Sequence, residues 1–217
     1  WRLDSLKAVS SSGMMWNPDN KQRLLRHAPQ AVLVDFLNSS EASGMGRAIS
    51  SQGKSGPAAR FKLGKNAVVI DAQGRPLQPG SPEIGRIAVR GGVPLGYYGD
   101  PQKTAATFPV IDGVRYAIPG DFARVEADGT VTLLGRGSVS INSGGEKVFP
   151  EEVEEALKTH PQVRDAVVVG VPDPVLGRLR LVLGLLRLLR HVRSVGGVHR
   201  AGHRVRACIR TAQDAKT

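Results

Sequence analysis

Residues 112 to 155 bring together side chains that could bind a nucleotide. Asp121 ends the run YAIPGD, Arg136 follows a glycine in LLGRG, and Gly144-Gly145 precede Lys147. A carboxylate that accepts hydrogen bonds from both hydroxyls of a ribose gains roughly 1.5 to 3 kcal/mol from each of them. We interpret this stretch as a candidate nucleotide site. The alternatives are a strand-end turn at Asp121, a surface ion pair at Arg136 and a plain turn at the glycine pair.

Several motifs resemble those of acyl-CoA synthetases of the adenylate-forming superfamily. YAIPGD is similar to the family's YRTGD and Gly135-Arg136 follows at the family's spacing, while LGYYGDPQKTAATF resembles GYxNDPExTxxxF and GRPLQPGSPEIGRIAVRG resembles GxPLPPGExGELxVRG. Enzymes of this family join a carboxylic acid to AMP and then pass the acyl group to coenzyme A. The resemblance covers residues 1 to about 177. GRGSVSINSGGEKVFPEEVEEAL and NSSE point more narrowly to actinobacterial fatty-acid and steroid-side-chain CoA ligases.

The resemblance implies roles for residues at the nucleotide and the hinge. Asp121 stands where the family has its ribose-binding aspartate, and Arg136 matches the arginine that touches the same ribose and opens the hinge. Ser138 takes the place of the common hinge aspartate. Gly144-Gly145 resemble the loop that moves to the active site for thioester formation, where glycine lets the backbone approach closely. Lys147 matches a basic residue that approaches the phosphates, with a solvated loop lysine as the alternative.

A second group of matches lies upstream. AVLVDFLNSSEAS resembles the family's YGxTE segment, with Ser40 and Glu41 at the Thr-Glu positions. Mg²⁺ prefers oxygen ligands and is often held by one carboxylate together with phosphate oxygens and waters. The resemblance therefore implies that Glu41 is the metal ligand; the alternative is a glutamate at a helix N-terminus behind Ser39 or Ser40. SSSGMMW, around Gly13, resembles the strand end that helps to wall the acyl pocket.

The chain also departs from the family pattern. Leu37-Asn38 stands where the family usually has Tyr-Gly, so the aromatic side chain that stacks on adenine is missing. The family's phosphate loop precedes the matched segment, and its catalytic lysine lies in a Pro-rich motif for which we find no match after Gly177. Because charge stabilisation is usually the largest catalytic term, we expect little or no turnover from this chain alone. The resemblance implies ATP, Mg²⁺ and coenzyme A as cofactors and a fatty or steroid-side-chain acid as substrate.

The pattern of apolar residues predicts the elements that position these residues. Residues 1 to 60 read as an α/β crossover that ends the large domain, with a helix in NPDNKQRLLRHAP and a strand in AVLVDFL. Short alternating runs predict a small antiparallel β subdomain over 61–137. Asp112-Gly113 and Asp128-Gly129 match the residues that a two-residue hairpin turn requires.

A truncated C-terminal α+β domain is expected over 138–177. It should contain a helix that begins at Pro150 and a strand over 165–171, and Val153 and Leu157 should form the apolar face of the helix. Residues 178–217 form a basic tail outside the resemblance. The fold class is thus α/β plus a small antiparallel β subdomain, the C-terminal part of an adenylate-forming fold.

Composition limits the other functions. The 217 residues carry a net charge of +11, but 178–217 hold nine Arg and one Lys against Asp214 alone, so the rest is nearly neutral. The single cysteine, Cys208, argues against a disulfide or a thiol-rich metal site. No apolar run approaches the ~20 residues of a membrane-spanning helix and the start lacks a signal-peptide pattern, so we expect a cytoplasmic protein.

Two further hypotheses stay open. The chain could be a non-catalytic fragment that pairs with another polypeptide supplying the missing N-terminal half. The tail could also form a basic amphipathic helix that makes a peripheral membrane contact. Nucleic-acid binding is disfavoured because the charge run has no interleaved aromatic residues. An out-of-frame reading of a GC-rich gene would also explain the abrupt change in composition after Gly177.

Overall fold

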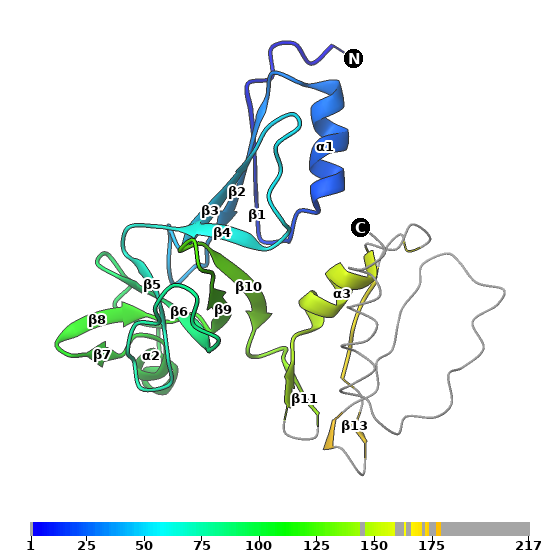
Figure 1. Cartoon of the computed structure of the whole chain (residues 1–217). Helices are drawn as coiled ribbons and strands as arrows, with labels where there is room; N and C mark the ends of the chain where they lie inside the picture. Colours follow the sequence, from blue (N-terminus) through cyan, green and yellow to red (C-terminus); the bar gives the residue numbers. More distant parts are fainter. Residues whose placement is uncertain are drawn as a thin grey trace. The chain divides into compact units, whose positions relative to one another are not determined.

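The computed structural model describes residues 2–143, 146–158, 163, 166–170, 172–173 and 177–178. The chain divides between Leu134 and Gly135 into two compact units (Figure 1). No helix of the described residues is long and apolar enough to cross a membrane.

The first unit begins with the expected α/β crossover. β1 (Ala8–Ser12) lies parallel to β2 (Val32–Leu37), and α1 (Pro18–His27) connects them. The Asn17 side chain caps the helix by accepting a hydrogen bond from the Asp19 backbone N–H at 2.7 Å, with proline at the first helical position. The helix and the strand predicted for this region are confirmed.

The described strands of this region form a ten-stranded sheet in the order β1-β2-β3-β4-β10-β9-β6-β8-β7, with β5 paired to β6 (Figure 1). β1 and β2 are parallel, and the pairs β2–β3, β3–β4, β4–β10, β5–β6, β6–β8, β6–β9 and β7–β8 are antiparallel. The remaining strands are β3 (Gly46–Ser50), β4 (Arg60–Leu63), β5 (Ala67–Ile70), β6 (Ile84–Arg90), β7 (Val110–Ile111), β8 (Val114–Ala117), β9 (Asp121–Val125) and β10 (Val131–Arg136), and α2 spans Pro101–Thr107. Strands before and after residue 60 belong to this one sheet. The domain boundaries expected from the sequence stay predictions.

The two Asp-Gly pairs form different turns. Asp112 and Gly113 connect β7 to β8 and both have positive φ, 48° and 75°, as a two-residue type I′ turn requires. At the second pair only Gly129 has positive φ, and the Glu126 N–H donates to the Thr130 carbonyl at 2.8 Å. This loop has three residues and places glycine in the left-handed position. The two-residue prediction is therefore confirmed for the first pair and wrong for the second.

Among the described residues, three hydrophobic clusters stabilise the first unit. One joins α1 to the adjacent strands through Leu25, Ala28, Ala31 and Leu33. A small one consists of Ile70, Ala88 and Ile118. The largest includes Met45, Phe61, Ile87, Phe108 and Val131. Full burial of one such large apolar side chain contributes about 1.5 to 3 kcal/mol.

In its described residues, the second unit contains a small sheet and one helix. The sheet order is β12-β11-β14-β13, with β11 at Ile141–Ser143, β12 at Glu146–Val148, β13 at Pro172–Asp173 and β14 at Gly177–Arg178. α3 (Pro150–Lys158) begins at the predicted proline, and Val153 and Leu157 pack with Ile141 and Val168 as expected. Residues 166–170 do not form a strand, although Ala166 and Val168 are buried. The strand prediction is wrong for these residues. Alternating burial of side chains does not make a strand unless the backbone also pairs with a neighbouring strand.

Candidate nucleotide-binding site

The carboxyl ends of β1 and β2 lie at the same edge of the sheet because the two strands are parallel. The Ser12 hydroxyl donates to the Phe36 carbonyl at 3.0 Å, which joins the two strand ends. Gly13 follows β1 with φ +86°, and a Cβ there would meet no atom within 4 Å. The segment containing Ser40 and Glu41 follows β2. Ligands of α/β sheets bind beyond the carboxyl ends of strands, so this edge is the appropriate place for a site.

The segment after β2 is a compact loop. Asn38 Oδ1 accepts a hydrogen bond from the Gly44 N–H at 2.7 Å, and Ser39 Oγ accepts one from the Ala42 N–H at 3.0 Å. Ser40 is exposed in this loop. Residues 38–45 contain no helix, so the alternative that Glu41 sits at a helix N-terminus is wrong. Asn38, which replaces the family's glycine, ties the loop to itself.

Glu41 is oriented by a tyrosine from a distant part of the chain. The Tyr97 hydroxyl donates to Glu41 Oε1 at 2.6 Å. The tyrosine is itself held by its N–H bond to Thr104 Oγ1 at 2.9 Å, and its ring packs against Phe108 at 5.6 Å between centroids. The sequence analysis gave Tyr97 no role in the site and did not predict this contact. The similarity of LGYYGDPQKTAATF to a family motif was the signal that could have found it.

The donor set fits a magnesium ion that takes most of its ligands from phosphates and waters. Among the described residues, no group of three or more His, Cys, Asp or Glu side chains could hold a metal by itself. One oriented carboxylate is sufficient when a nucleotide supplies the other oxygens. Glu41 can fill that role.

Asp121 is the first residue of β9 and is only 7% exposed. It follows Gly120, whose φ of +99° turns the chain into the strand. Ala117 and Ala123, on either side of Asp121, belong to the same hydrophobic cluster as Ala42 beside Glu41. The loop after β2 and the start of β9 therefore pack around a common core.

The other predicted site residues belong to the second unit. Arg136 ends β10 and, like Ser138, is exposed. Gly135 precedes them with φ +136°, a backbone conformation that favours glycine. The exposed Lys147 lies opposite Asn142 in the pairing of β11 with β12. Gly144 and Gly145 lie outside the described residues. Asp121 and Arg136 fall in different units, and their shared ribose contact stays a prediction.

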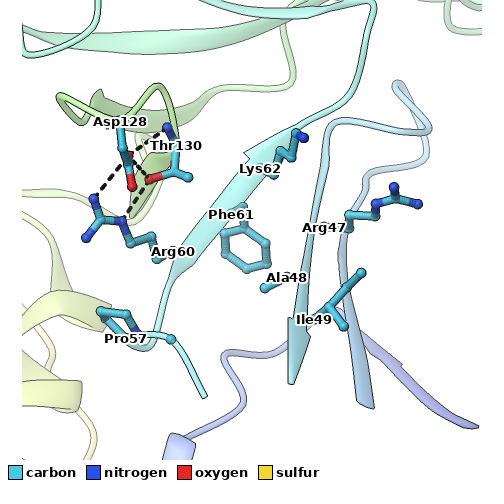
Figure 2. A pocket seen from close by; sticks show the side chains of 10 residues that line it. Arg47, Ala48, Ile49, Pro57, Arg60, Phe61, Lys62, Asp128 and Thr130 are labelled. Carbon is cyan, nitrogen blue, oxygen red and sulfur yellow. Dashed lines mark hydrogen bonds and ion pairs between the residues drawn. The ribbon is translucent and has the colours of Figure 1, made fainter. Parts of the chain in front are cut away.

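A groove of about 500 Å³ lies elsewhere in the first unit, where β3 and β4 diverge (Figure 2). None of the predicted site residues lines it. Its lining residues are Arg47, Ala48, Ile49, Gly56, Pro57, Arg60, Phe61, Lys62, Asp128 and Thr130.

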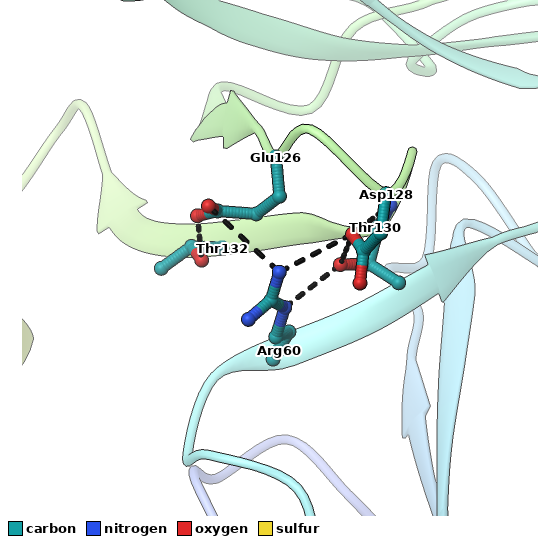
Figure 3. Close-up of polar contacts among 5 residues, drawn as sticks. All are labelled: Arg60, Glu126, Asp128, Thr130 and Thr132. Carbon is teal, nitrogen blue, oxygen red and sulfur yellow. Dashed lines mark hydrogen bonds and ion pairs between the residues drawn. The ribbon is translucent and has the colours of Figure 1, made fainter. Parts of the chain in front are cut away.

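A polar network borders this groove (Figure 3). Arg60 donates to Thr130 Oγ1 at 2.8 Å and to Asp128 Oδ1 at 3.2 Å, and lies 3.8 Å from Glu126 Oε2. Hydrogen bonds from the Thr130 hydroxyl and N–H hold the pKa of Asp128 below its usual value, and the charge of Arg60 lowers it further. The guanidinium of Arg60 is thus already neutralised by acidic neighbours.

Comparisons with known proteins identify similar sequences. Residues 152–208 match the AMP-binding enzyme C-terminal domain. This match extends beyond residue 177, at which the resemblance found in the sequence analysis ends. The 3-oxocholest-4-en-26-oate-CoA ligase of Rhodococcus rhodochrous is 52% identical over 185 residues, which are 84% of this chain and 33% of that protein. A medium/long-chain-fatty-acid-CoA/3-oxocholest-4-en-26-oate-CoA ligase of Mycolicibacterium smegmatis is 54% identical over 179 residues, 81% of this chain and 32% of that protein. The chain spans about a third of the length of these curated relatives.

Solved structures support the fold. The anthranilate CoA ligase AuaEII in complex with anthranoyl-AMP aligns with a TM-score of 0.66 at 22% identity, covering 97% of this chain and 37% of that chain. The amide bond synthetase McbA from Marinactinospora thermotolerans aligns with a TM-score of 0.65 at 23% identity, covering 95% and 40%. At this identity the likeness concerns the fold alone.

Proposed function

We propose that this chain, which belongs to the adenylate-forming enzymes and corresponds to the C-terminal part of their CoA ligases, supplies the nucleotide-binding end and the hinge of a fatty-acid or steroid-side-chain CoA ligase. Enzymes of this family use ATP and coenzyme A. The reaction would convert a carboxylic acid to acyl-AMP and then to acyl-CoA. The observation that carries the proposal is the packing of the Glu41 loop and the Asp121 strand around one core, with Glu41 held by Tyr97.

Each residue has a role in binding the nucleotide. Asp121 accepts hydrogen bonds from the ribose hydroxyls, and Arg136 contacts the same sugar before the hinge at Ser138. Ser40 and Lys147 lie toward the phosphates. Glu41 holds a magnesium ion, which when bound neutralises charge on the phosphates.

The remaining roles concern the acyl group. Gly13 contributes to the wall of the acyl pocket, where the absence of a side chain leaves space after β1. Gly144-Gly145 form the loop that admits the thiol of coenzyme A. We place the protein in the cytoplasm, where its substrates would be a fatty or steroid-side-chain acid, ATP and coenzyme A.

The chain alone should turn over little substrate, because the family's phosphate loop and catalytic lysine have no match in it. A second candidate function follows: a non-catalytic polypeptide that works only together with a partner supplying the N-terminal half. The exposure of Val32, Phe36 and Ile49 on one side of the sheet favours this alternative. ATP-pyrophosphate exchange distinguishes the two, since robust exchange by the 217-residue chain alone would contradict the need for a partner.

The site itself is tested in a reconstituted enzyme. The chain is co-expressed with the unmatched N-terminal part of the Rhodococcus rhodochrous ligase, and binding of ATP to the complex is measured by isothermal titration calorimetry. Asp121→Asn should raise the Kd for ATP about 10- to 100-fold, the loss expected for weakened charge-assisted bonds. The matched control is Asp112→Asn, because asparagine suits the type I′ turn and should leave the Kd unchanged. An unchanged Kd in Asp121→Asn would contradict the ribose role.

A further inference from the structure

Tyr97 contacts the carboxylate of Glu41 from a position 56 residues further along the chain. Its hydroxyl donates to Glu41 Oε1 at 2.6 Å, within the range of a hydrogen bond to an ionised acceptor. An ionised carboxylate has about four acceptor positions, which its two oxygens share. The hydrogen bond of Tyr97 takes up part of the capacity of one oxygen and restricts the rotation of the carboxylate.

The helix α2 and the turn before it restrain Tyr97 at its backbone and at its ring. The backbone N–H of Tyr97 donates to Thr104 Oγ1 at 2.9 Å, and the Thr104 hydroxyl donates to the Asp100 carbonyl at 2.7 Å. The Tyr97 ring centroid lies 5.6 Å from that of Phe108 and 4.2 Å from Lys103 Nζ. A cation so close to an aromatic ring is attracted to its face. The phenol that reaches Glu41 is therefore held in place.

The turn that carries Tyr97 packs closely against α2. A Cβ at Gly96, the preceding residue, would lie 2.5 Å from Thr104 Cγ2 and 2.8 Å from Thr104 Oγ1. Glycine suits this position because it lets the backbone of the turn approach the helix. Tyr98, the next residue, is fully exposed. The two adjacent tyrosines thus differ, because α2 restrains the first and the second faces solvent.

A carboxylate can bind a cation through one oxygen or through both, and the two modes suit different ions. Ca²⁺ accepts both modes in a flexible shell, with oxygens at about 2.3 to 2.6 Å. Mg²⁺ demands a nearly ideal octahedron at about 2.0 to 2.1 Å. The two oxygens of one carboxylate are too close together to occupy two corners of that octahedron. A hydrogen bond that holds one oxygen therefore favours Mg²⁺.

We propose that Tyr97 sets the metal preference of this site. By holding Oε1 it restricts Glu41 to binding a cation through a single oxygen, which favours Mg²⁺ over Ca²⁺. Thr104 acts through Tyr97, because it fixes the tyrosine backbone. The inference rests on the proposed function, in which Glu41 holds the magnesium ion of bound ATP. It adds a positioning residue and an ion selectivity to that role.

The test measures binding of ATP with different metal ions rather than turnover. The chain is co-expressed with the unmatched N-terminal part of the Rhodococcus rhodochrous ligase, and no carboxylic acid is added, so no adenylate forms. Isothermal titration calorimetry gives the Kd for ATP in Mg²⁺, in Ca²⁺ and in EDTA. Tyr97→Phe should raise the Kd about 10-fold in Mg²⁺, the loss expected when a residue that orients a metal ligand is removed. The rise in Ca²⁺ should stay below about twofold, because Ca²⁺ tolerates either binding mode. The Kd in EDTA should not change.

The matched control is Tyr98→Phe, which removes the hydroxyl of the exposed neighbour and should leave every Kd unchanged. Thr104→Val keeps the shape of the side chain but loses the acceptor for the Tyr97 N–H, and should raise the Kd in Mg²⁺ about two- to fivefold. In a Tyr97→Phe background it should have no further effect, as for two residues that act in series. A full additional effect there would contradict the role of Thr104. Circular dichroism melting checks that each variant is folded.

Two results would overturn the inference. An unchanged Kd in Mg²⁺ for Tyr97→Phe would mean that the tyrosine does not position Glu41. Equal rises in Mg²⁺ and Ca²⁺ would mean that it does not set the ion preference.

Glu41→Gln separates such a failure from a failure of the proposed function. If Glu41→Gln raises the Kd in Mg²⁺ and Tyr97→Phe does not, the inference alone is wrong. If neither variant raises it, or the complex binds no ATP, the metal role of Glu41 is wrong as well.

Discussion

On the α1 side of strands β1 to β4 a lysine and an aspartate are buried together, whereas on the other side two cations stand opposite each other in solvent. Lys21 Nζ lies 3.1 Å from Asp35 Oδ2, and each residue is 4% exposed. The Trp16 ring lies 5.7 Å from the same ammonium group. The other side, which we call the open face, carries Val32, Phe36, Arg47, Ile49 and Lys62. No ion pair joins Arg47 or Lys62 to a carboxylate among the described residues. One side of the sheet therefore has its charges paired and buried, and the other leaves two like charges exposed.

The largest expected effect comes from breaking the buried ion pair between Lys21 and Asp35. Asp35→Ala should lower the free energy of unfolding by about 3 to 5 kcal/mol, because it leaves the Lys21 ammonium buried without a counter-charge. Urea unfolding followed by circular dichroism measures the change. The double variant Lys21→Met/Asp35→Leu should recover most of the loss, since apolar residues of similar volume can replace a buried ion pair. A double variant as unstable as Asp35→Ala would mean that packing, rather than the unpaired charge, causes the loss.

Two neighbouring residues of β2 offer a direct contrast between the sides. Leu33→Ala on the buried side should cost about 2 to 5 kcal/mol, because it removes packed methyl groups and leaves a cavity. Val32→Ala on the open face should cost less than about 1 kcal/mol, since the side chain is already partly in water. Comparable losses for both in urea unfolding would show that Val32 is packed as tightly as Leu33 in the isolated chain, against their exposures.

The open face also predicts a stabilising change. Lys62→Glu should raise the stability of the isolated chain by about 0.2 to 1 kcal/mol, because it replaces a like-charge cross-strand pair by an opposite-charge pair with Arg47. Thermal unfolding measures the difference, with Lys65→Glu as a neutral control on the adjacent turn. A loss of stability in the isolated chain would show that Lys62 already has a favourable contact there.

The sequence predicted the local elements better than their partners. The helix in residues 17–29, the helix that begins at Pro150 and the Asp112-Gly113 turn depend on bonds between near neighbours, and the sequence predicted all three. The contact of Tyr97 with Glu41 was missed because it joins residues far apart in the chain. The strand prediction was wrong for residues 166–170 for a similar reason, because a strand needs a partner that composition does not identify. Asp121 and Glu41 were placed by resemblance, and their roles stay predictions.

The smallest expected effect concerns Asp128, which forms an ion pair with Arg60. The folded-state pKa of Asp128 lies below its ordinary value of about 3.9, so its contribution to stability is present above that pH and is lost as the pH falls through the folded-state pKa. Asp128→Asn should therefore lower the melting temperature slightly at pH 7, and the difference from the unaltered chain should vanish in acid. Because Asp128 is largely exposed, solvent screens its interaction with Arg60 and keeps the effect small. A difference in melting temperature that persists unchanged in acid would contradict this prediction. It would mean that the charge of Asp128 does not cause the loss of stability.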